Sequence, residues 1–150
     1  MTTTMQKRST IAAMCAGLGL TVGVTLIPHL ARGRLSDHIQ AGYPDYPPAR
    51  IDSAVSIYVV YLSVVGALGI LCWLGAIWAV KAGKRWAPAA AAATFAVGTG
   101  VALFNLLVKD TSGDTGLPPM LGWAGLLPCL AGLVALLLLF IRINRKEVST

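Results

Sequence analysis

Residues 54–80 read AVSIYVVYLSVVGALGILCWLGAIWAV, a stretch of 27 residues without Asp, Glu, Lys or Arg. About 20 such apolar residues, wound as a helix that rises ~1.5 Å per residue, cross the roughly 30 Å hydrocarbon layer of a membrane. A half-exposed strand would need a polar residue at every second position, and this stretch has no such alternation. Residues 54–80 therefore predict a transmembrane helix, long enough to tilt or to project beyond the lipid.

Three further apolar stretches without charge lie at residues 10–30, 86–108 and 121–141. Each is near or above the length that one span requires. All charged residues of the chain fall between or beyond the four stretches. The sequence thus predicts an all-α fold in which residues 1–150 form a single membrane domain, an antiparallel bundle of four transmembrane helices.

The composition of the chain excludes a soluble domain. Of its 150 residues 56% are hydrophobic and 12% are charged, and the mean hydropathy is +0.72. An ordinary soluble domain carries roughly 25% charged residues. A cytosolic enzyme or a nucleic-acid-binding domain is therefore not expected, and the lipid bilayer is the first partner that the composition predicts.

Basic residues gather on one side of the predicted membrane. The segment before residue 10, the 81–85 turn and the segment after residue 141 together hold eight Lys or Arg and one Glu, a net charge of +7. The connections 31–53 and 109–120 hold four basic and five acidic residues, a net charge of −1. Since Lys and Arg accumulate in cytoplasmic segments, both termini and the 81–85 turn are predicted to be cytoplasmic. The overall charge of +6 is then a sign of orientation and requires no nucleic acid.

The first apolar stretch is not expected to be a cleaved signal peptide. It is longer than the about 7–15 residues of a typical signal-peptide core, and no A-x-A cleavage pattern follows it. We therefore expect residues 10–30 to remain in the mature protein as the first span.

The two outward connections are polar and rich in turn-forming residues. Within the longer one, 31–53, residues 43–48 read YPDYPP, where proline favours extended or turning backbone. Asp52 or Ser53 is expected to cap the helix that follows. The second connection contains KDTSGDTGLPP, which lacks both the phosphate-loop pattern and the closing Glu of a calcium loop, so tight turns account for its composition.

Small residues four positions apart mark possible contacts between helices. Gly19 and Gly23 form the close-approach pattern, which serves either to pack the helices of one chain or to join two copies in a homo-oligomer. Pro128, in the middle of the last stretch, predicts a kink because it lacks an amide donor. The three cysteines form no Cys-x-x-Cys pair and are expected to be buried free thiols.

The predicted spans contain few residues that could take part in transport or catalysis. Transporters that move protons or cations usually keep an ionisable residue inside the bilayer, and none of the four stretches contains one. Small four-helix multidrug transporters, which depend on a carboxylate in the membrane, are therefore a poor match. Asn105 lies near the outward end of the third stretch, and its side-chain amide is expected to form a hydrogen bond with another helix. It is also a candidate ligand-binding residue.

The remaining candidate binding residues lie on the outward side, at His29, His38, Asp110 and Asp114. Histidine and aspartate are metal ligands, but zinc needs three or four ligands at suitable spacing, and no such spacing is present. The sequence predicts no metal, no cofactor and no catalytic residue.

Several short segments resemble a known group of proteins. These are residues 38–61, 83–86 (GKRW), 110–119 (DTSGDTGLPP) and 121–123 (LGW). They are similar to small four-span integral membrane proteins of actinobacteria, a group without an assigned activity. The resemblance implies the same architecture and a location in the bacterial inner (plasma) membrane, and it supplies no catalytic residues.

Three functional hypotheses follow from the sequence. The first is a non-enzymatic accessory or interaction subunit that binds another membrane protein. The second is a protein that binds or transports an apolar or lipid-like molecule between its helices, near Asn105 and Pro128. The third is an outward metal or enzyme site around His29, His38, Asp110 and Asp114.

Overall fold

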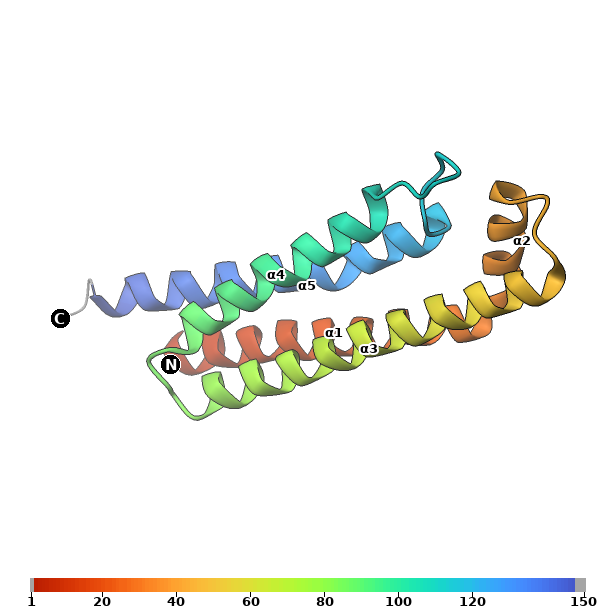
Figure 1. Cartoon of the computed structure of the whole chain (residues 1–150). Coiled ribbons are helices and arrows are strands. Elements are labelled where there is room, and N and C mark those ends of the chain that lie inside the picture. Colours follow the sequence, from red (N-terminus) through yellow and green to blue (C-terminus); the bar gives the residue numbers. More distant parts are fainter. Residues whose placement is uncertain (1, 148–150) are drawn as a thin grey trace.

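The computed structural model of the chain describes residues 2–147. It contains, in order, the helices α1 (Thr2–Leu30), α2 (Arg32–Gly42), α3 (Pro48–Lys81), α4 (Ala87–Leu107) and α5 (Pro119–Glu147). Four stretches are long and apolar enough to cross a membrane: Met5–Leu30, Pro48–Lys81, Ala87–Leu107 and Pro119–Ile141. The prediction of an all-α antiparallel four-helix membrane bundle is therefore confirmed (Figure 1).

The four long helices are arranged around the bundle in the order α3, α1, α5, α4. Helix α1 packs along both α3 and α5, and α4 packs along α5. Helices α3 and α4 contact each other far less, so the α3–α4 seam is the loosest side of the bundle (Figure 1). We call the end that carries α2 the α2 end. The opposite end, with the connection between α3 and α4 and both termini, is the basic end.

Glycines allow the long helices to approach closely. A methyl group at Gly17 of α1 would overlap the ring of Trp73 on α3, and one at Gly66 of α3 would overlap Thr25 of α1. Gly132 of α5 similarly faces Phe95 of α4. In lipid, where no hydrophobic force drives helices together, such close packing is a main source of association.

Buried apolar side chains form one cluster at each end of the bundle. The cluster at the α2 end contains Leu35, Ile39, Ile51, Val55, Val59, Leu117 and Leu121. The cluster at the basic end contains Met14, Ala79, Val80, Ala87, Ala135 and Leu139. The contacts of Gly17, Gly66 and Gly132 described above add to these two clusters.

The connection 31–53 differs from the open loop that the sequence suggested. Helix α2 occupies its first half, and α3 begins at Pro48 instead of about residue 54. The predicted cap at Asp52 or Ser53 is wrong. Both residues lie inside α3, where Ser53 Oγ donates to the carbonyl of Ala49 (2.9 Å). Proline at the first helical position suits its fixed φ and its missing amide, which explains the earlier start.

Gly19 and Gly23 do not take the first of their two predicted roles, and two of the cysteines are not buried as expected. Gly19 and Gly23 face out of the bundle, with no heavy atom within 4 Å of a β-carbon added at either. They therefore do not pack the helices of this chain together, a role that Gly17 fills instead. The cysteines are free, as expected, but Cys15 and Cys72 are exposed on the bundle surface and only Cys129 is partly buried. Pro128 lies inside α5.

Candidate functional site

A polar structure lies at the α2 end of the protein. We call it the α2 platform and define it as residues 32–59, which contain α2, the turn after it and the first turns of α3, together with the loop of residues 108–118. It unites segments far apart in the sequence. Its arrangement follows from three sets of contacts, one apolar and two polar.

Helix α2 is held on α3 by two apolar residues. Leu35 and Ile39, one helical turn apart, are 0% and 6% exposed. They pack in the cluster with Ile51 and Val55 of α3 and with Leu117 of the loop. Residues at positions i and i+4 share one face of a helix, so α2 buries this face and leaves the rest of its surface polar.

The loop of residues 108–118 is closed by its own backbone hydrogen bonds. The amide of Asp110 donates to the carbonyl of Asp114 (2.9 Å), and the amide of Gly116 donates to the carbonyl of Val108 (3.1 Å). The turn between them requires Gly113, whose φ of 90° is unfavourable for residues with a side chain. The DTSGDTG sequence therefore forms a compact, ordered turn.

Two side chains of the α2 region connect it to this loop. His38 Nε2 donates to the carbonyl of Thr115 (2.7 Å), since a carbonyl oxygen can only accept. The hydroxyl of Tyr43, directly after α2, lies 2.6 Å from Thr111 Oγ1. Together with the apolar contact, these bonds hold α2 and the loop as one unit.

Asp110 is the acidic group that the platform stabilises most clearly in its ionised form. Its carboxylate accepts hydrogen bonds from the hydroxyl and from the amide of Ser112, the latter at 2.8 Å. The Ser112 hydroxyl is the main cause that lowers the pKa of Asp110 below its usual value. The Tyr43 hydroxyl and the His38 ring lower this pKa further.

The structure brings together only some of the residues predicted as sites. His38, Asp110 and Asp114 belong to the α2 platform, with Asp114 exposed in the loop. His29 lies on α1, where its Nε2 is 2.9 Å from Ser63 Oγ of α3. Among the described residues 2–147 no group of three or more His, Cys, Asp or Glu could hold a metal ion. The residues proposed for an outward metal site thus do not converge.

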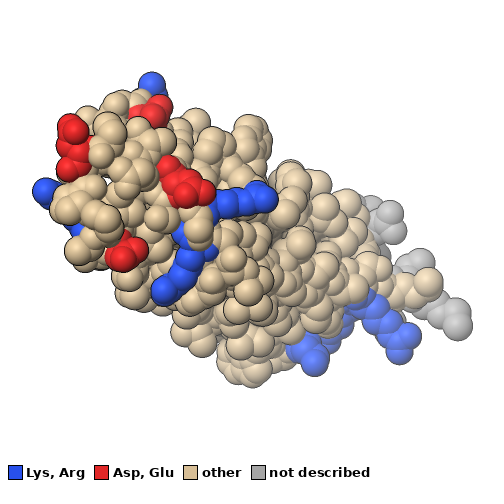
Figure 2. All heavy atoms as spheres, turned by 90° about the vertical axis from the view of Figure 1, so that its right-hand side faces the viewer, with Lys and Arg blue, Asp and Glu red and all other residues tan. Residues whose placement is uncertain are grey.

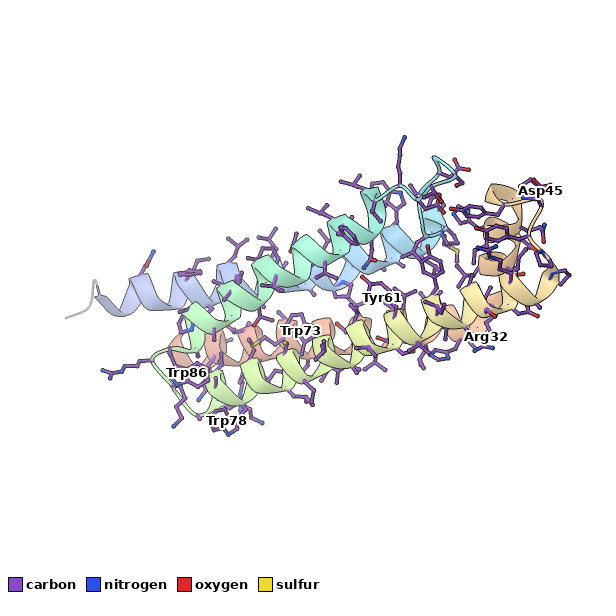
Figure 3. All side chains as sticks on the ribbon, viewed as in Figure 1. Arg32, Asp45, Tyr61, Trp73, Trp78 and Trp86 are labelled. Carbon is purple, nitrogen blue, oxygen red and sulfur yellow. The ribbon has the colours of Figure 1, made fainter. Side chains whose placement is uncertain are left out.

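Asn105 lies apart from the platform, on the α3–α4 seam. Its Oδ1 accepts a hydrogen bond of 3.0 Å from the hydroxyl of Tyr61 on α3. Asn105 therefore has the partner on another helix that the sequence predicted. Figure 3 labels Tyr61 on the side of α3 that faces α4 and α5.

Sequence reasoning missed most of the platform contacts. The pairing of Leu35 with Ile39 was a detectable signal for a short amphipathic helix. No local signal identifies Thr111 or Thr115 as partners of α2, because their bonds join segments about 70 residues apart. Such contacts emerge only when the chain is folded.

Charged side chains cluster at this end of the molecule. Figure 2, which views the α2 end, shows acidic side chains on the platform with basic ones between them. Among them Asp37, Asp45 and Asp114 are exposed. The platform is thus a polar surface of mixed charge above the apolar bundle.

Comparison with protein-family models, curated proteins and solved structures finds no match for this chain. What the structure itself shows is a membrane protein with four apolar helices and an ordered polar platform at one end.

Proposed function

We propose that the protein is a non-enzymatic accessory subunit of the bacterial inner (plasma) membrane, and that the α2 platform binds the extracytoplasmic part of another membrane protein. One observation carries this proposal: the platform is fixed by the His38–Thr115 and Tyr43–Thr111 hydrogen bonds and by buried Leu35. A surface ordered in advance loses little conformational freedom on binding, which favours association.

The distribution of charge supports the orientation in this proposal. The basic end carries most of the Lys and Arg residues, and the α2 end carries the five Asp residues. Trp78 and Trp86 also lie together at the basic end, with ring centroids 6.3 Å apart and Lys84 above Trp78 (Figure 3). Tryptophan is enriched at membrane boundaries, and positive charge is enriched on the cytoplasmic side.

The resemblance to small four-span actinobacterial proteins agrees with this proposal. Much of it falls on residues 38–61 and 110–119, which are the segments that build the α2 platform. That group has no assigned activity, so the resemblance supports the location and leaves the partner to experiment.

Site-specific crosslinking in native membranes tests the docking role. A photo-crosslinking amino acid at Asp45 or Asp114, both exposed on the platform, should trap one defined partner. The same probe at Leu71, on the apolar surface of α3 outside the platform, is the matched control and should not trap that partner. Disrupting the platform with Leu35→Asp in the Asp45 probe variant should abolish the crosslink. A chain that forms no platform crosslink in its native membrane contradicts the proposal.

We also propose a second partner, which is another copy of this chain, so that the protein forms a homo-oligomer. Gly19 and Gly23 face outward with open space around them, so a helix of a second copy can approach there. Replacing Gly23 by Leu should then dissociate the oligomer. The same replacement at Gly98 of α4, which is equally open, should not change the oligomeric state. If the unmodified protein is a monomer in native-like lipid, the homo-oligomer is ruled out.

A second candidate function is binding of an apolar or lipid-like molecule at the α3–α4 seam. The specific observation is the Tyr61–Asn105 hydrogen bond on the side of the bundle where helices pack least. A molecule there would meet apolar walls and one polar pair. Co-purified ligand should be lost on Asn105→Leu and kept on Thr99→Val, which removes a hydroxyl without a partner in the structure. Equal retention in both variants rules out this candidate.

A further inference from the structure

A groove lies within the α2 platform, between α2 and α3. It has a volume of about 310 Å³, near the lower end of the range for small-molecule sites. It is lined by Arg32, Gly33 and Ser36 of α2 and by Asp52, Val55 and Ser56 of α3. Figure 3 labels Arg32 close to where α2 meets the first part of α3.

The two walls of the groove carry opposite charge. Arg32 on the α2 wall offers a guanidinium, which binds phosphate oxygens through two parallel hydrogen bonds. Asp52 on the α3 wall offers a carboxylate, which accepts hydrogen bonds from an ammonium group. Ser36 and Ser56 add a hydroxyl to each wall, and buried Val55 closes the groove toward the bundle. This arrangement is complementary to a ligand that holds a phosphate and an ammonium group a short distance apart.

The groove lies where the apolar surface of the bundle begins. Helix α1 ends at Leu30, two residues before Arg32, and the uncharged part of α3 starts directly after Asp52. Ser56, Val60 and Val64 follow one another at four-residue intervals and so share one face of α3. Val60 and Val64 are 63% and 55% exposed, so an apolar strip leads from the groove along the bundle.

We propose that this groove binds the headgroup of a zwitterionic phospholipid that carries a primary ammonium. The phosphate lies against Arg32 and the serine hydroxyls, the ammonium lies against Asp52, and an acyl chain follows Val60 and Val64. Arg32 and Gly33 also begin α2, and the positive end of a helix dipole favours the phosphate there. The groove belongs to the α2 platform, but neither crosslinking position, Asp45 nor Asp114, lines it, so lipid binding and partner docking are tested at different residues.

Lipid retention by the full-length protein tests the proposal. The protein is purified in detergent, incubated with equal amounts of phosphatidylethanolamine and phosphatidylglycerol, and examined by native mass spectrometry. Phosphatidylethanolamine should be retained preferentially, because phosphatidylglycerol has no ammonium for Asp52. Equal retention of the two lipids by the unmodified protein overturns the proposal.

Charge variants in the groove distinguish the roles of its two walls. Arg32→Gln should lower retention of both lipids about tenfold, the loss expected for one charge-assisted hydrogen-bond pair. Asp52→Asn should lower retention of phosphatidylethanolamine and raise that of phosphatidylglycerol, since the repelling carboxylate is gone. Arg34→Gln is the matched control, because Arg34 lies on the same helix outside the groove and contacts Met120. A loss on Arg34→Gln as large as that on Arg32→Gln overturns the proposal.

Two further experiments test whether the loss of binding comes from poor folding and whether the natural ligand is a soluble headgroup compound. Arg32→Lys keeps the positive charge but not the paired hydrogen bonds, so it should retain more of the binding than Arg32→Gln and less than the unmodified protein. Glycerophosphoethanolamine, which has the headgroup without acyl chains, should compete only weakly because it cannot use Val60 and Val64. Competition as strong as that of the intact lipid contradicts a membrane lipid as the occupant.

Discussion

The indole of Trp73 on α3 reaches α1 and donates a hydrogen bond of 2.9 Å to Thr21 Oγ1. Thr21 in turn donates to the carbonyl of Gly17 (2.8 Å), and the Trp73 ring lies directly over Gly17. The side chain labelled in Figure 3 thus combines close packing and a polar contact at one point of the α1–α3 interface. Inside a membrane both depend on Gly17 having no side chain.

Gly17→Ala should destabilise the bundle. The added methyl group overlaps the Trp73 ring, and overpacking of a close contact costs about 1–3 kcal/mol. Gly19→Ala is the matched control on the same helix, because it meets no atom within 4 Å and should leave stability unchanged. Unfolding in mixed micelles, followed by helical signal, measures both variants. Equal stability of the two would contradict the assigned orientation of α1.

Trp73→Phe should cost the hydrogen bond while keeping most of the ring. The expected loss in the free energy of unfolding is about 0.5–1.5 kcal/mol, the usual net contribution of such a bond. Thr21→Val should cause a similar loss, and the double variant should lose less than the sum, since both remove the same interaction. Fully additive losses would show that Trp73 and Thr21 do not interact.

Ser112→Ala should raise the pKa of Asp110 toward its ordinary value. The Ser112 hydroxyl donates to the ionised carboxylate and is the largest cause of the lowered pKa. Carboxyl carbon shifts in an NMR titration of the labelled protein measure the change. A titration of Asp110 that is the same in the variant as in the unmodified protein would contradict this role.

The sign of the pH dependence follows from the same shift. Because the folded pKa is lowered, the ionised Asp110 stabilises the 108–118 loop at pH values above its ordinary, unfolded pKa. That contribution is lost as the pH falls through the lowered pKa. The protection of the loop amides, which is the intrinsic exchange rate relative to the observed rate at the same pH, should therefore fall on acidification in the unmodified protein, and Ser112→Ala should show the change at higher pH.

Leu35→Ala should release α2 from α3. Removing this fully buried side chain leaves a cavity in the apolar cluster, and comparable losses cost about 2–5 kcal/mol. Leu30→Ala is a suitable control, because Leu30 is 87% exposed at the end of α1. Hydrogen exchange should rise in residues 32–42 for Leu35→Ala alone. Protection of α2 that is unchanged by Leu35→Ala would contradict the packing.

Membrane-impermeant maleimide should label the two ends of the bundle from opposite sides. In a chain whose three cysteines are replaced by serine, Asp45→Cys should react in intact cells. Lys84→Cys should react only after the membrane is permeabilised. The reverse pattern would invert the orientation that the charge distribution predicts.

The spans, their number and their antiparallel order could be predicted from the sequence alone. Residues 54–80 contain no charge over a length that crosses a membrane, and every charged residue falls outside the four apolar stretches. The cost of placing charge in lipid is large and local, so it can be read from a single stretch of chain. The accumulation of Lys and Arg on one side of the membrane can likewise be read directly from the sequence.

Tertiary structure alone decided which faces of these helices meet. Gly17 and Gly19 are two residues apart in an equally apolar stretch, yet one lies against Trp73 and the other faces outward. The platform could not be predicted from the sequence either, because its His38–Thr115 hydrogen bond joins residues 77 positions apart. Every face of an apolar helix is compatible with lipid, so hydropathy does not show which face packs against another helix. Only the packing of one helix on another, through shape and a few hydrogen bonds, selects the face that is buried.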